Sequence, residues 1–241
     1  MTSVSRPFLT ADWHHVLGVT YATEVAPLVP YLPPGAEIDE LDGAARVSLV
    51  AFGFRRTRVR GLAIAGHITF PEINLRFYVR LHGERAVVFI REFVPRPAIS
   101  LVARLLYNEP YRTIPMRETV IEPGSGPRAR LGVRHRFGPR HRNRIEAWAD
   151  PSAREPEPGS PEYWLTHHDI GLGTAHDGRT RSYRVEHPVW ALHEVSDLKL
   201  DVDFAALYGR EWGWLHDAQP SHVTLAAGSG VGISAPVDTQ P

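Results

Sequence analysis

The sequence contains no cysteine. Disulfide bonds, thiolate nucleophiles and metal sites with cysteine ligands are therefore excluded. Lysine is almost as scarce, because arginine supplies nearly all of the 27 basic residues and Lys199 is the only lysine. Any reaction mechanism that needs an amine side chain consequently has a single candidate residue.

Long apolar runs are also absent. No uninterrupted run approaches the roughly 20 residues that a membrane-spanning helix needs, and the first residues, MTSVSRPFLTADWHH, lack the apolar stretch of a secretory signal. The 27 acidic and 27 basic residues give a formal net charge of zero, which predicts neither bulk binding of nucleic acid nor attraction to an anionic membrane. We therefore expect a cytoplasmic protein whose partner is a small molecule.

Chain length and the composition of the ends indicate one domain. A chain of 241 residues lies within the range of single all-β barrels and sandwiches. The segment from about Ala227 onward is rich in Gly, Ser and Pro. We expect one domain over residues 1–226 and a flexible C-terminal tail over residues 227–241, and residues 1–12 are likewise expected to fray.

Short apolar runs separated by turn residues dominate the chain, and they predict mainly strands. Asp42-Gly43 and His82-Gly83 are hairpin signals. The expected strands cover residues 17–21, 45–54, 69–81, 85–93, 117–122, 130–137, 144–149, 181–187 and 221–226.

The best helix signal lies within residues 95–111, where Pro97 stands in the first turn and Pro110 follows the end. Its apolar stripe consists of Ala98, Leu101, Val102 and Leu105. Short helices are also expected near 25–32 and 202–208, and residues 150–162 form a proline-rich loop. Strands, one principal helix and then more strands predict a mostly antiparallel α+β fold, either a barrel or a half-open sheet wrapped around a helix.

The strand expected at residues 69–81 alternates polar and apolar side chains. One face carries Glu72, Asn74, Arg76 and Tyr78, and the other carries Ile73, Leu75, Phe77 and Val79. The polar face has two interpretations. It meets water while the apolar face covers the core, or it lines the interior of a barrel, where buried polar groups are costly and are retained for a ligand.

Several segments, taken in order, resemble one known family. They are LTADWHHVLGVTYATEVAPLVPYLPPGAEIDELDGAARVSLVAFGF, FPEINLRFYVR, ARLLYNEPYRTIPM, PEYWLTHHD and VEHPVWALHEV. This series is similar to the YqjF-like proteins, a largely uncharacterised family placed in the acetoacetate decarboxylase-like superfamily, over roughly residues 9–200. The resemblance implies a single domain built on a cone-like β-barrel around a small-molecule cavity, with Glu72, Asn74 and Arg76 facing that cavity.

The chain departs from the decarboxylase at the residue that carries its chemistry. The resemblance implies that the decarboxylase carries two adjacent lysines just after the corresponding helix. One of them forms a Schiff base with the keto substrate. Here the corresponding stretch is NEPYRTIPM, in which Tyr111 or Arg112 stands where the amine is needed. A guanidinium stays protonated and cannot serve as the nucleophile. Lys199, in SDLKLD, is expected on the surface.

The remaining side chains suit acid–base chemistry without an imine. Glu72 would move a proton if burial raised its pKa, Tyr111 would polarise a carbonyl group, and Arg76 would hold a substrate carboxylate. These roles suit enolisation, hydration, dehydration or decarboxylation through a non-covalent enolate, as in a lyase-like or hydratase-like enzyme. Alternatively, the same groups, with Asn74 and Tyr78, bind a small carboxylate- or carbonyl-bearing molecule without catalysis, as in a sensing protein.

Thirteen histidines invite a metal-site interpretation, which their spacing does not support. Adjacent histidines such as His14-His15 point to opposite faces of a strand, and no H-E-x-x-H or comparable spacing occurs. We expect no metal and no cofactor. His187 and Trp190, in VEHPVWAL, resemble the family's H-x-x-W segment and are candidate ligand contacts; alternatively, His187 caps a strand end and stacks near Trp190.

Residues 128–144 hold seven arginines and two histidines around the turn Gly138-Pro139. Such a hairpin could bind nucleic-acid phosphate. Aromatic residues are sparse within it, however, and alternating arginines also suit a solvent-facing edge that resists edge-to-edge association. We expect no nucleic-acid partner. Proteins of the superfamily often assemble, so a homo-oligomer is compatible with the resemblance, although no segment identifies an interface.

The scarcity of lysine makes the case against imine chemistry testable. When the protein is incubated with small keto acids and sodium borohydride, we expect intact-protein mass spectrometry to show no covalent adduct, because borohydride fixes a substrate only where an imine has formed. Labelling at any residue would contradict this expectation, and labelling at Lys199 would identify the amine responsible.

Overall fold

The computed structural model describes residues 7–126 and 129–239. Its strands are β1 (Leu9–Thr23), β2 (Ala36–Ile38), β3 (Ala45–Val59), β4 (Phe70–Leu81), β5 (Glu84–Val94), β6 (Tyr111–Thr113), β7 (Met116–Ile121), β8 (Leu131–Phe137), β9 (Asn143–Arg154), β10 (Ile170–Thr174), β11 (Thr180–Glu186), β12 (Leu192–Asp201), β13 (His222–Ile233) and β14 (Val237–Thr239). The helices are α1 (Pro97–Leu106), α2 (Pro161–Thr166) and α3 (Phe204–Tyr208), with 3₁₀ segments η1 (Val29–Tyr31), η2 (Pro139–His141) and η3 (Arg210–His216).

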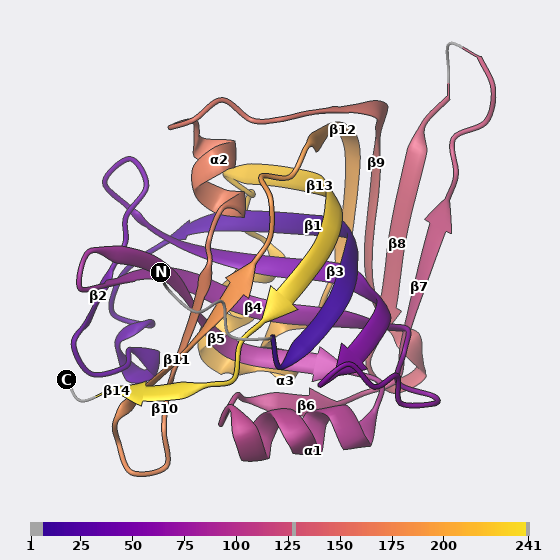
Figure 1. Cartoon of the computed structure of the whole chain (residues 1–241). Coiled ribbons are helices and arrows are strands. Elements are labelled where there is room, and N and C mark those ends of the chain that lie inside the picture. Colours follow the sequence, from indigo (N-terminus) through magenta and orange to yellow (C-terminus); the bar gives the residue numbers. More distant parts are fainter. Residues whose placement is uncertain (1–6, 127–128, 240–241) are drawn as a thin grey trace.

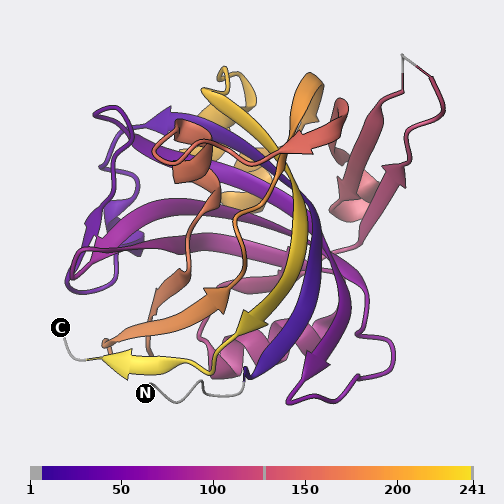
Figure 2. The ribbon, with the colours of Figure 1, turned by 45° about the horizontal axis from the view of Figure 1, so that its top comes forward.

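The strands form one sheet in which neighbours are mostly antiparallel (Figure 1). The strand order is β14-β11-β10-β5-β4-β3-β1-β13-β12-β9-β8-β7, with β2 on β4 and β6 on β5. β11 also pairs with β13, through Val185 opposite Ile233 and Glu186 opposite Gly232. The strands from β11 to β13 therefore form a ring, which Figure 2 shows from a tilted direction. The predicted α+β class with mostly antiparallel strands is confirmed.

The alternation in β4 separates two environments. Ile73, Leu75 and Phe77 belong to the main hydrophobic core, together with residues of β8, β9, α3 and η3 outside the ring. Glu72 is on the other face, where it shares a cavity with residues of β1, β11 and β13 from across the ring. Glu72 and Asn74 are 3% and 2% exposed. The interpretation in which this face meets water is therefore wrong for these two residues.

Helix α1 lies across one side of the ring beside β6 (Figure 1). Its predicted position is confirmed, but only half of its apolar stripe faces the ring. Ala98 and Val102 line the cavity together with Ile99 and Ala103, whereas Leu101 and Leu105 are 56% and 65% exposed. The expectation of a sheet wrapped around this helix is therefore wrong, because α1 lies at one side of the ring and not inside it (Figure 1).

Both ends of the chain contribute more to the sheet than their composition predicts. β1 begins at Leu9, inside the segment expected to fray. β13 continues past residue 226 to Ile233 and pairs with β1, and β14 pairs with β11. The boundary predicted at residue 226 is therefore wrong, because glycine and serine permit close strand pairing here. Residues 1–6 and 240–241 lie outside the described residues.

Two connecting segments also differ from their predictions. Residues 25–32 contain only the short segment η1 instead of a helix. The proline-rich loop expected at 150–162 is shorter, because β9 continues to Arg154 and α2 begins at Pro161, where the Ser160 hydroxyl caps the helix by accepting a hydrogen bond from the Tyr163 amide. Strands β10 and β12 were not expected from the sequence pattern.

The arginine-rich segment forms β8, η2 and β9. Arg134 donates a hydrogen bond of 2.6 Å to Glu146, and Arg144 pairs with the same carboxylate. Arg130 pairs with Asp197 on β12. These ion pairs neutralise part of the positive charge, which argues against a phosphate-binding hairpin. The sheet-edge interpretation is wrong, because β8 and β9 are internal strands and β7 forms this edge of the sheet. Arg128 lies outside the described residues.

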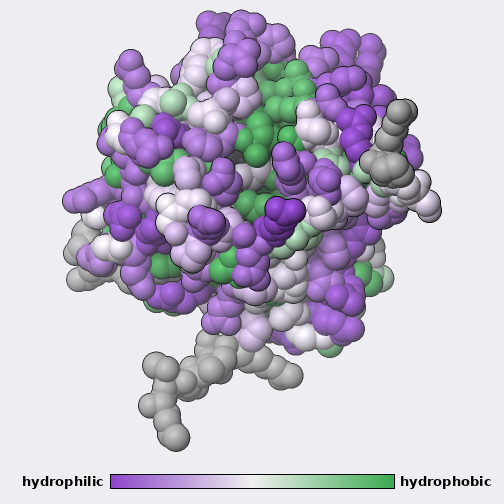
Figure 3. Space-filling model, turned by 90° about the horizontal axis from the view of Figure 1, so that it is seen from above, coloured by the Kyte–Doolittle hydropathy of each residue, from purple (hydrophilic) through white to green (hydrophobic). Residues whose placement is uncertain are grey.

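No helix within residues 7–126 or 129–239 has the length and apolar character needed to cross a membrane. The face seen from above in Figure 3 is mostly hydrophilic, with a limited strip of hydrophobic side chains. Helix α1, at the opposite side of the molecule, exposes several large apolar residues.

Gly228 occupies a position on β13 that only glycine fits. Its φ is +84°, and an added Cβ would lie 1.9 Å from the carbonyl oxygen of Trp13 on β1. Gly43 has a φ of +71° and no atom within 4 Å of the same position. We expect Gly43→Ala to lower the free energy of unfolding by about 1–2 kcal/mol through left-handed backbone strain.

Gly228→Ala should cost clearly more than Gly43→Ala, because β1 must move away from β13 to make room for the methyl group. Urea unfolding of both variants measures the difference. Equal midpoints for the two variants would contradict the close approach of β1 and β13.

Candidate functional site

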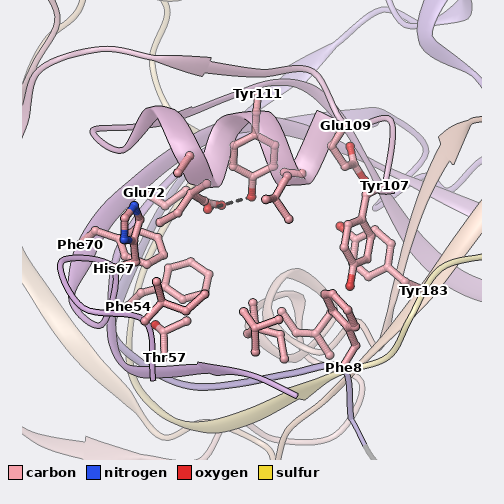
Figure 4. Close-up of a pocket in the computed structure, with 18 of the residues that line it drawn as sticks. Phe8, Phe54, Thr57, His67, Phe70, Glu72, Tyr107, Glu109, Tyr111 and Tyr183 are labelled. Atoms are coloured by element: carbon pink, nitrogen blue, oxygen red, sulfur yellow. Dashed lines mark hydrogen bonds between the residues drawn. The ribbon is translucent and has the colours of Figure 1, made fainter. Parts of the chain in front are cut away.

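A cavity of about 220 Å³ lies between α1, the ring interior and the connection from β3 to β4, residues 60–69. Much of its wall is apolar and includes Phe8, Phe54, Phe70, Ile99 and Val102. Its polar residues include the buried Glu72, Glu109 and Thr57 and the half-buried His67, Tyr111 and Tyr183. Figure 4 shows Glu72 and Tyr111 pointing toward one another, with Glu109 and Tyr183 farther along the wall. The described lining contains no arginine and no lysine.

Separate elements bring the polar groups together. Glu72 points inward from β4, and Glu92 lies on β5 opposite Asn74. β6 pairs with β5 so that Tyr111 stands opposite Glu92. Glu109 lies in the short connection between α1 and β6. Glu72 and Glu92 therefore adjoin the Tyr111 phenol, and Glu109 lies beside Tyr183 farther along the same region.

Tyr183 reaches this region from β11 because its partner strand leaves space. It stands opposite Gly171 of β10, and a Cβ added at Gly171 would lie 2.3 Å from the tyrosine ring. A side chain at residue 171 would therefore displace the phenol. Glycine is required here for its lack of volume, as its backbone conformation lies outside the left-handed region.

Glu72 is the best-connected carboxyl group of the site. The Tyr111 hydroxyl donates a hydrogen bond of 2.8 Å to Glu72 Oε2, and Asn74 Nδ2 donates one of 3.3 Å to Glu72 Oε1. Glu92 and Glu109 are also buried, and each has an Oε1 atom with no hydrogen-bond partner among the described residues. Glu109 lines the cavity, although its unpaired Oε1 atom is itself buried.

Burial keeps these carboxyl groups partly protonated near neutral pH. Desolvation raises the pKa of Glu72 to about 7, against the opposing effect of the hydrogen bonds from Tyr111 and Asn74. Desolvation likewise raises the pKa of Glu109 to about 8. The pKa of Glu92 is raised well above its ordinary value by desolvation and by the charges of Glu109 and Glu72. The cluster therefore contains groups able to donate a proton beside a group able to accept one.

The phenols of the cluster stay protonated. Desolvation and the neighbouring carboxyl charges raise the pKa values of Tyr111 and Tyr183 well above the ordinary value for tyrosine. Both hydroxyl groups are therefore hydrogen-bond donors at neutral pH.

The sequence analysis identified Glu72, Asn74 and Tyr111, which the structure brings together, but it missed Glu92. A regular β4–β5 hairpin would place Arg91 on the same side as Asn74. A bulge between Leu75 and Arg76 shifts the pairing by one residue, so that Glu92 faces inward and Arg91 faces outward toward α3, where it donates to the Leu207 carbonyl. Glu109 and Tyr183 were also missed, since no local pattern signals their contact with β4.

Five candidate residues do not line the cavity: Asn74, which contacts it only through Glu72, and Arg76, Tyr78, His187 and Trp190. Arg76 is half-buried farther along β4, with its guanidinium carbon 5.9 Å from the centre of the Tyr78 ring. The Tyr78 hydroxyl lies 2.7 Å from Ser48 Oγ. His187 stacks on Trp190 with ring centres 4.0 Å apart, in agreement with the stacked arrangement weighed as the alternative to ligand contact. A ligand role for these residues stays a prediction.

The described side chains around the cavity provide neither a set of metal ligands nor an amine. Within residues 7–126 and 129–239, no group of three or more histidine or acidic residues is arranged to hold a metal ion. Lys199 lies exposed on β12. The chemistry available at the cavity is therefore that of carboxyl and phenol groups, together with the His67 imidazole and the Thr57 hydroxyl (Figure 4).

Comparison with known proteins gives the family. A model of the DUF2071 family, described as "Uncharacterized conserved protein", matches residues 10–230. The chain belongs to the DUF2071 family. It is also 32% identical over 100 residues to the uncharacterized protein YqjF of Bacillus subtilis (strain 168), and this match spans 41% of this chain and 41% of YqjF. The resemblance to YqjF-like proteins is confirmed.

Solved structures share the fold of this DUF2071 protein. An acetoacetate decarboxylase-like enzyme from Sphingomonas wittichii RW1 superposes with a TM-score of 0.63 at 15% identity, covering 99% of this chain and 95% of that chain. The enduracididine biosynthesis enzyme MppR, complexed with pyruvate, superposes with a TM-score of 0.61 at 16% identity, covering 98% of this chain and 92% of that chain. At these identities the likeness concerns the fold alone.

The buried carboxyl groups predict a pH dependence of stability. The folded-state pKa values of about 7 for Glu72 and about 8 for Glu109 exceed the value of about 4.3 for an unfolded glutamate. The folded state therefore binds more protons between these limits. Stability is fully present below about pH 4 and falls as the pH rises toward 8, by about 1.4 kcal/mol per pH unit for each additional proton.

Urea unfolding of Glu109→Gln between about pH 5 and 8 should show a shallower loss of stability than the wild type, because the amide does not ionise. Glu157→Gln, at an exposed position in the loop before α2, should keep the wild-type slope. A wild-type slope in Glu109→Gln would contradict a protonated Glu109 in the folded protein.

Proposed function

We propose that the cavity binds a small carbonyl-bearing molecule and that Glu72 and Tyr111 carry out acid–base chemistry on it, of the lyase or hydratase type and without a Schiff base. The observation that carries the proposal is the 2.8 Å hydrogen bond between Tyr111 and Glu72 at the wall of a cavity whose described lining has no amine. Asn74 holds the second oxygen of Glu72.

The protonation of the cluster favours a carbonyl group as its ligand. A carbonyl oxygen accepts hydrogen bonds, and the phenols and the protonated carboxyl groups donate them. A neutral carboxylic acid in an apolar site stabilises an enolate or delivers a proton to it, while a nearby carboxylate removes the proton from the adjacent carbon. Glu72, with a pKa of about 7, is poised for the second role, and Glu109, with a pKa of about 8, for the first.

A ligand carboxylate is less well supported than a carbonyl group. Arg76, the residue expected to hold a carboxylate, does not line the cavity. A ligand carboxylate beside Glu72, Glu92 and Glu109 would be repelled by whichever of these groups is ionised, and the desolvated site would strengthen that repulsion. We therefore propose the carbonyl-bearing class. The neighbour MppR is complexed with pyruvate, which carries both a carbonyl group and a carboxylate, so it is a precedent for a small carbonyl compound in this fold without deciding between the two groups.

The ring of strands supports further proposals. We propose that it forms the cone-like barrel that the resemblance implies, with the cavity as its interior. The single-domain organisation, the cytoplasmic location and a homo-oligomeric state stay predictions. A non-catalytic binding or sensing protein is the alternative function, favoured by the largely apolar wall.

Exchange of α-protons distinguishes catalysis from binding without requiring the natural substrate. We expect the wild type to accelerate the loss of the methyl proton signal of acetophenone or acetone in deuterated water, measured by nuclear magnetic resonance. Glu72→Gln should slow this exchange by about 10²-fold or more, since general acid–base catalysis contributes on that order. Tyr111→Phe should also slow it, because Glu72 loses the hydrogen bond that positions it.

A matched control is Glu118→Gln. Glu118 is a largely buried glutamate on β7 whose pKa is also raised by desolvation, but it does not line the cavity. Its variant should exchange protons at the wild-type rate. If the wild type binds these ketones but their protons exchange at the rate measured in buffer alone, the catalytic proposal is contradicted and the non-catalytic alternative is supported.

A further inference from the structure

The apolar part of the cavity indicates what the rest of the ligand looks like. Phe54 and Phe70 stack with ring centres 4.7 Å apart and planes inclined by 14°, and both line the cavity beside Glu72. Phe8 lies across the cavity from Tyr111 in Figure 4. A ligand whose carbonyl group meets the acidic cluster therefore places its remaining atoms against aromatic and aliphatic side chains.

The cavity is larger than a small keto acid requires. An apolar cavity of about 150 Å³ accommodates a benzene molecule. The volume of about 220 Å³ leaves room for a ring of that size together with a carbonyl group and a short substituent. Acetone or pyruvate would leave the phenylalanine side of the cavity unfilled, and unfilled apolar space forfeits van der Waals contacts.

Charge selects against the acidic members of the class. The described lining contains no arginine or lysine to pair with a ligand carboxylate, while Glu72 and Glu109 are buried in the wall. An aromatic or aliphatic acid would therefore bury its charge among carboxyl groups, with His67 as the sole basic side chain of the described lining, which is unfavourable. An uncharged carbonyl compound avoids this cost.

The opening of the cavity is apolar as well. Leu62 and Ile64, in the β3–β4 connection, are 72% and 50% exposed, and Val102 of α1 is 45% exposed. All three line the cavity, so they are in contact with both water and the ligand space. Covering these side chains with an apolar group of a ligand would remove apolar surface from water, which favours binding.

We infer, on the basis of the proposed function, that the substrate is an uncharged carbonyl compound bearing a hydrocarbon or aryl group about the size of a phenyl ring. The carbonyl group points to Glu72, Tyr111 and Glu109, and the apolar group lies against Phe54, Phe70 and the inner face of α1. Longer apolar substituents extend through the opening between Val102 and the β3–β4 connection.

Five probes separate the contributions of the two ends. Acetophenone carries both a carbonyl group and a ring; ethylbenzene lacks the carbonyl group; benzoate adds a charge; acetone and pyruvate lack the ring. Isothermal titration calorimetry with the full chain should show acetophenone binding at least tenfold more tightly than acetone, pyruvate and benzoate. Ethylbenzene should bind more weakly than acetophenone and more tightly than acetone.

Two variants test the position of the apolar group. Ala103→Phe fills the cavity from α1, and Val102→Asp places a charge at its opening; each should weaken acetophenone binding at least tenfold. Leu101, on the same helix, is exposed and does not line the cavity. The control variant Leu101→Ala should therefore bind acetophenone as tightly as the wild type does. Circular dichroism verifies that the three variants keep the fold.

The outcomes distinguish this inference from the proposed function. Tighter binding of acetone or pyruvate than of acetophenone, with α-proton exchange accelerated, would overturn the apolar substrate class and leave the acid–base function intact. Equal binding of ethylbenzene and acetophenone, unchanged by Glu72→Gln and Tyr111→Phe, would support the apolar site and overturn carbonyl recognition. Failure of acetophenone to bind would overturn the inference outright.

Discussion

The burial of three carboxyl groups without an ion-pairing partner at the cavity is the constraint on which the rest of the site depends. Ionised carboxylates are costly to remove from water, so a buried group without a cation retains its proton to higher pH. Glu72, Glu92 and Glu109 all follow this rule. The ring of strands keeps water away from them, and the cluster consequently offers proton donors and a proton acceptor within one small volume.

Local irregularities of the backbone create this cluster. The bulge in the β4–β5 pair decides that a carboxyl group, Glu92, faces the interior while the guanidinium of Arg91 turns outward. Gly171 leaves the space that the Tyr183 ring occupies. Without the bulge the interior would hold a cation beside Glu72, which would lower the pKa of that carboxyl group and leave it a permanent anion. The protonation state of the site thus depends on the register of one hairpin.

Sequence periodicity was sufficient for much of the fold and for part of the site. Alternation along residues 70–81 identified β4 and put Glu72 and Asn74 on one face, and the family resemblance directed that face inward. Periodicity does not say how far along the ring a residue lies. Arg76 is about 13 Å from Glu72 along an extended strand, at about 3.3 Å per residue, and it lies beyond the cavity wall.

Contacts between distant parts of the chain could not be predicted from the sequence, because periodicity describes only the local strand. Tyr183 reaches the site because β10, its hairpin partner, pairs with the distant strand β5, and Glu109 precedes β6, which also pairs with β5. Local patterns do not encode such pairings. The composition of the C-terminal segment was misleading in another way. Glycine favours flexibility in an isolated chain, yet at Gly228 the same lack of a side chain lets β13 approach β1 closely. The strand therefore continues into the segment predicted to be a tail, as far as Ile233.

The absence of an amine changes how the proposed chemistry would handle charge. An imine withdraws electrons through a positively charged nitrogen, whereas the cavity of this protein offers hydrogen-bond donors without a formal positive charge. Negative charge developing on a substrate oxygen beside Glu92 and Glu109 would be repelled if either were ionised. Proton delivery from a neutral carboxyl group or phenol as the charge develops removes that repulsion. The raised pKa values and the proton-transfer function therefore have one origin, the exclusion of water from a ring whose inner wall is largely apolar.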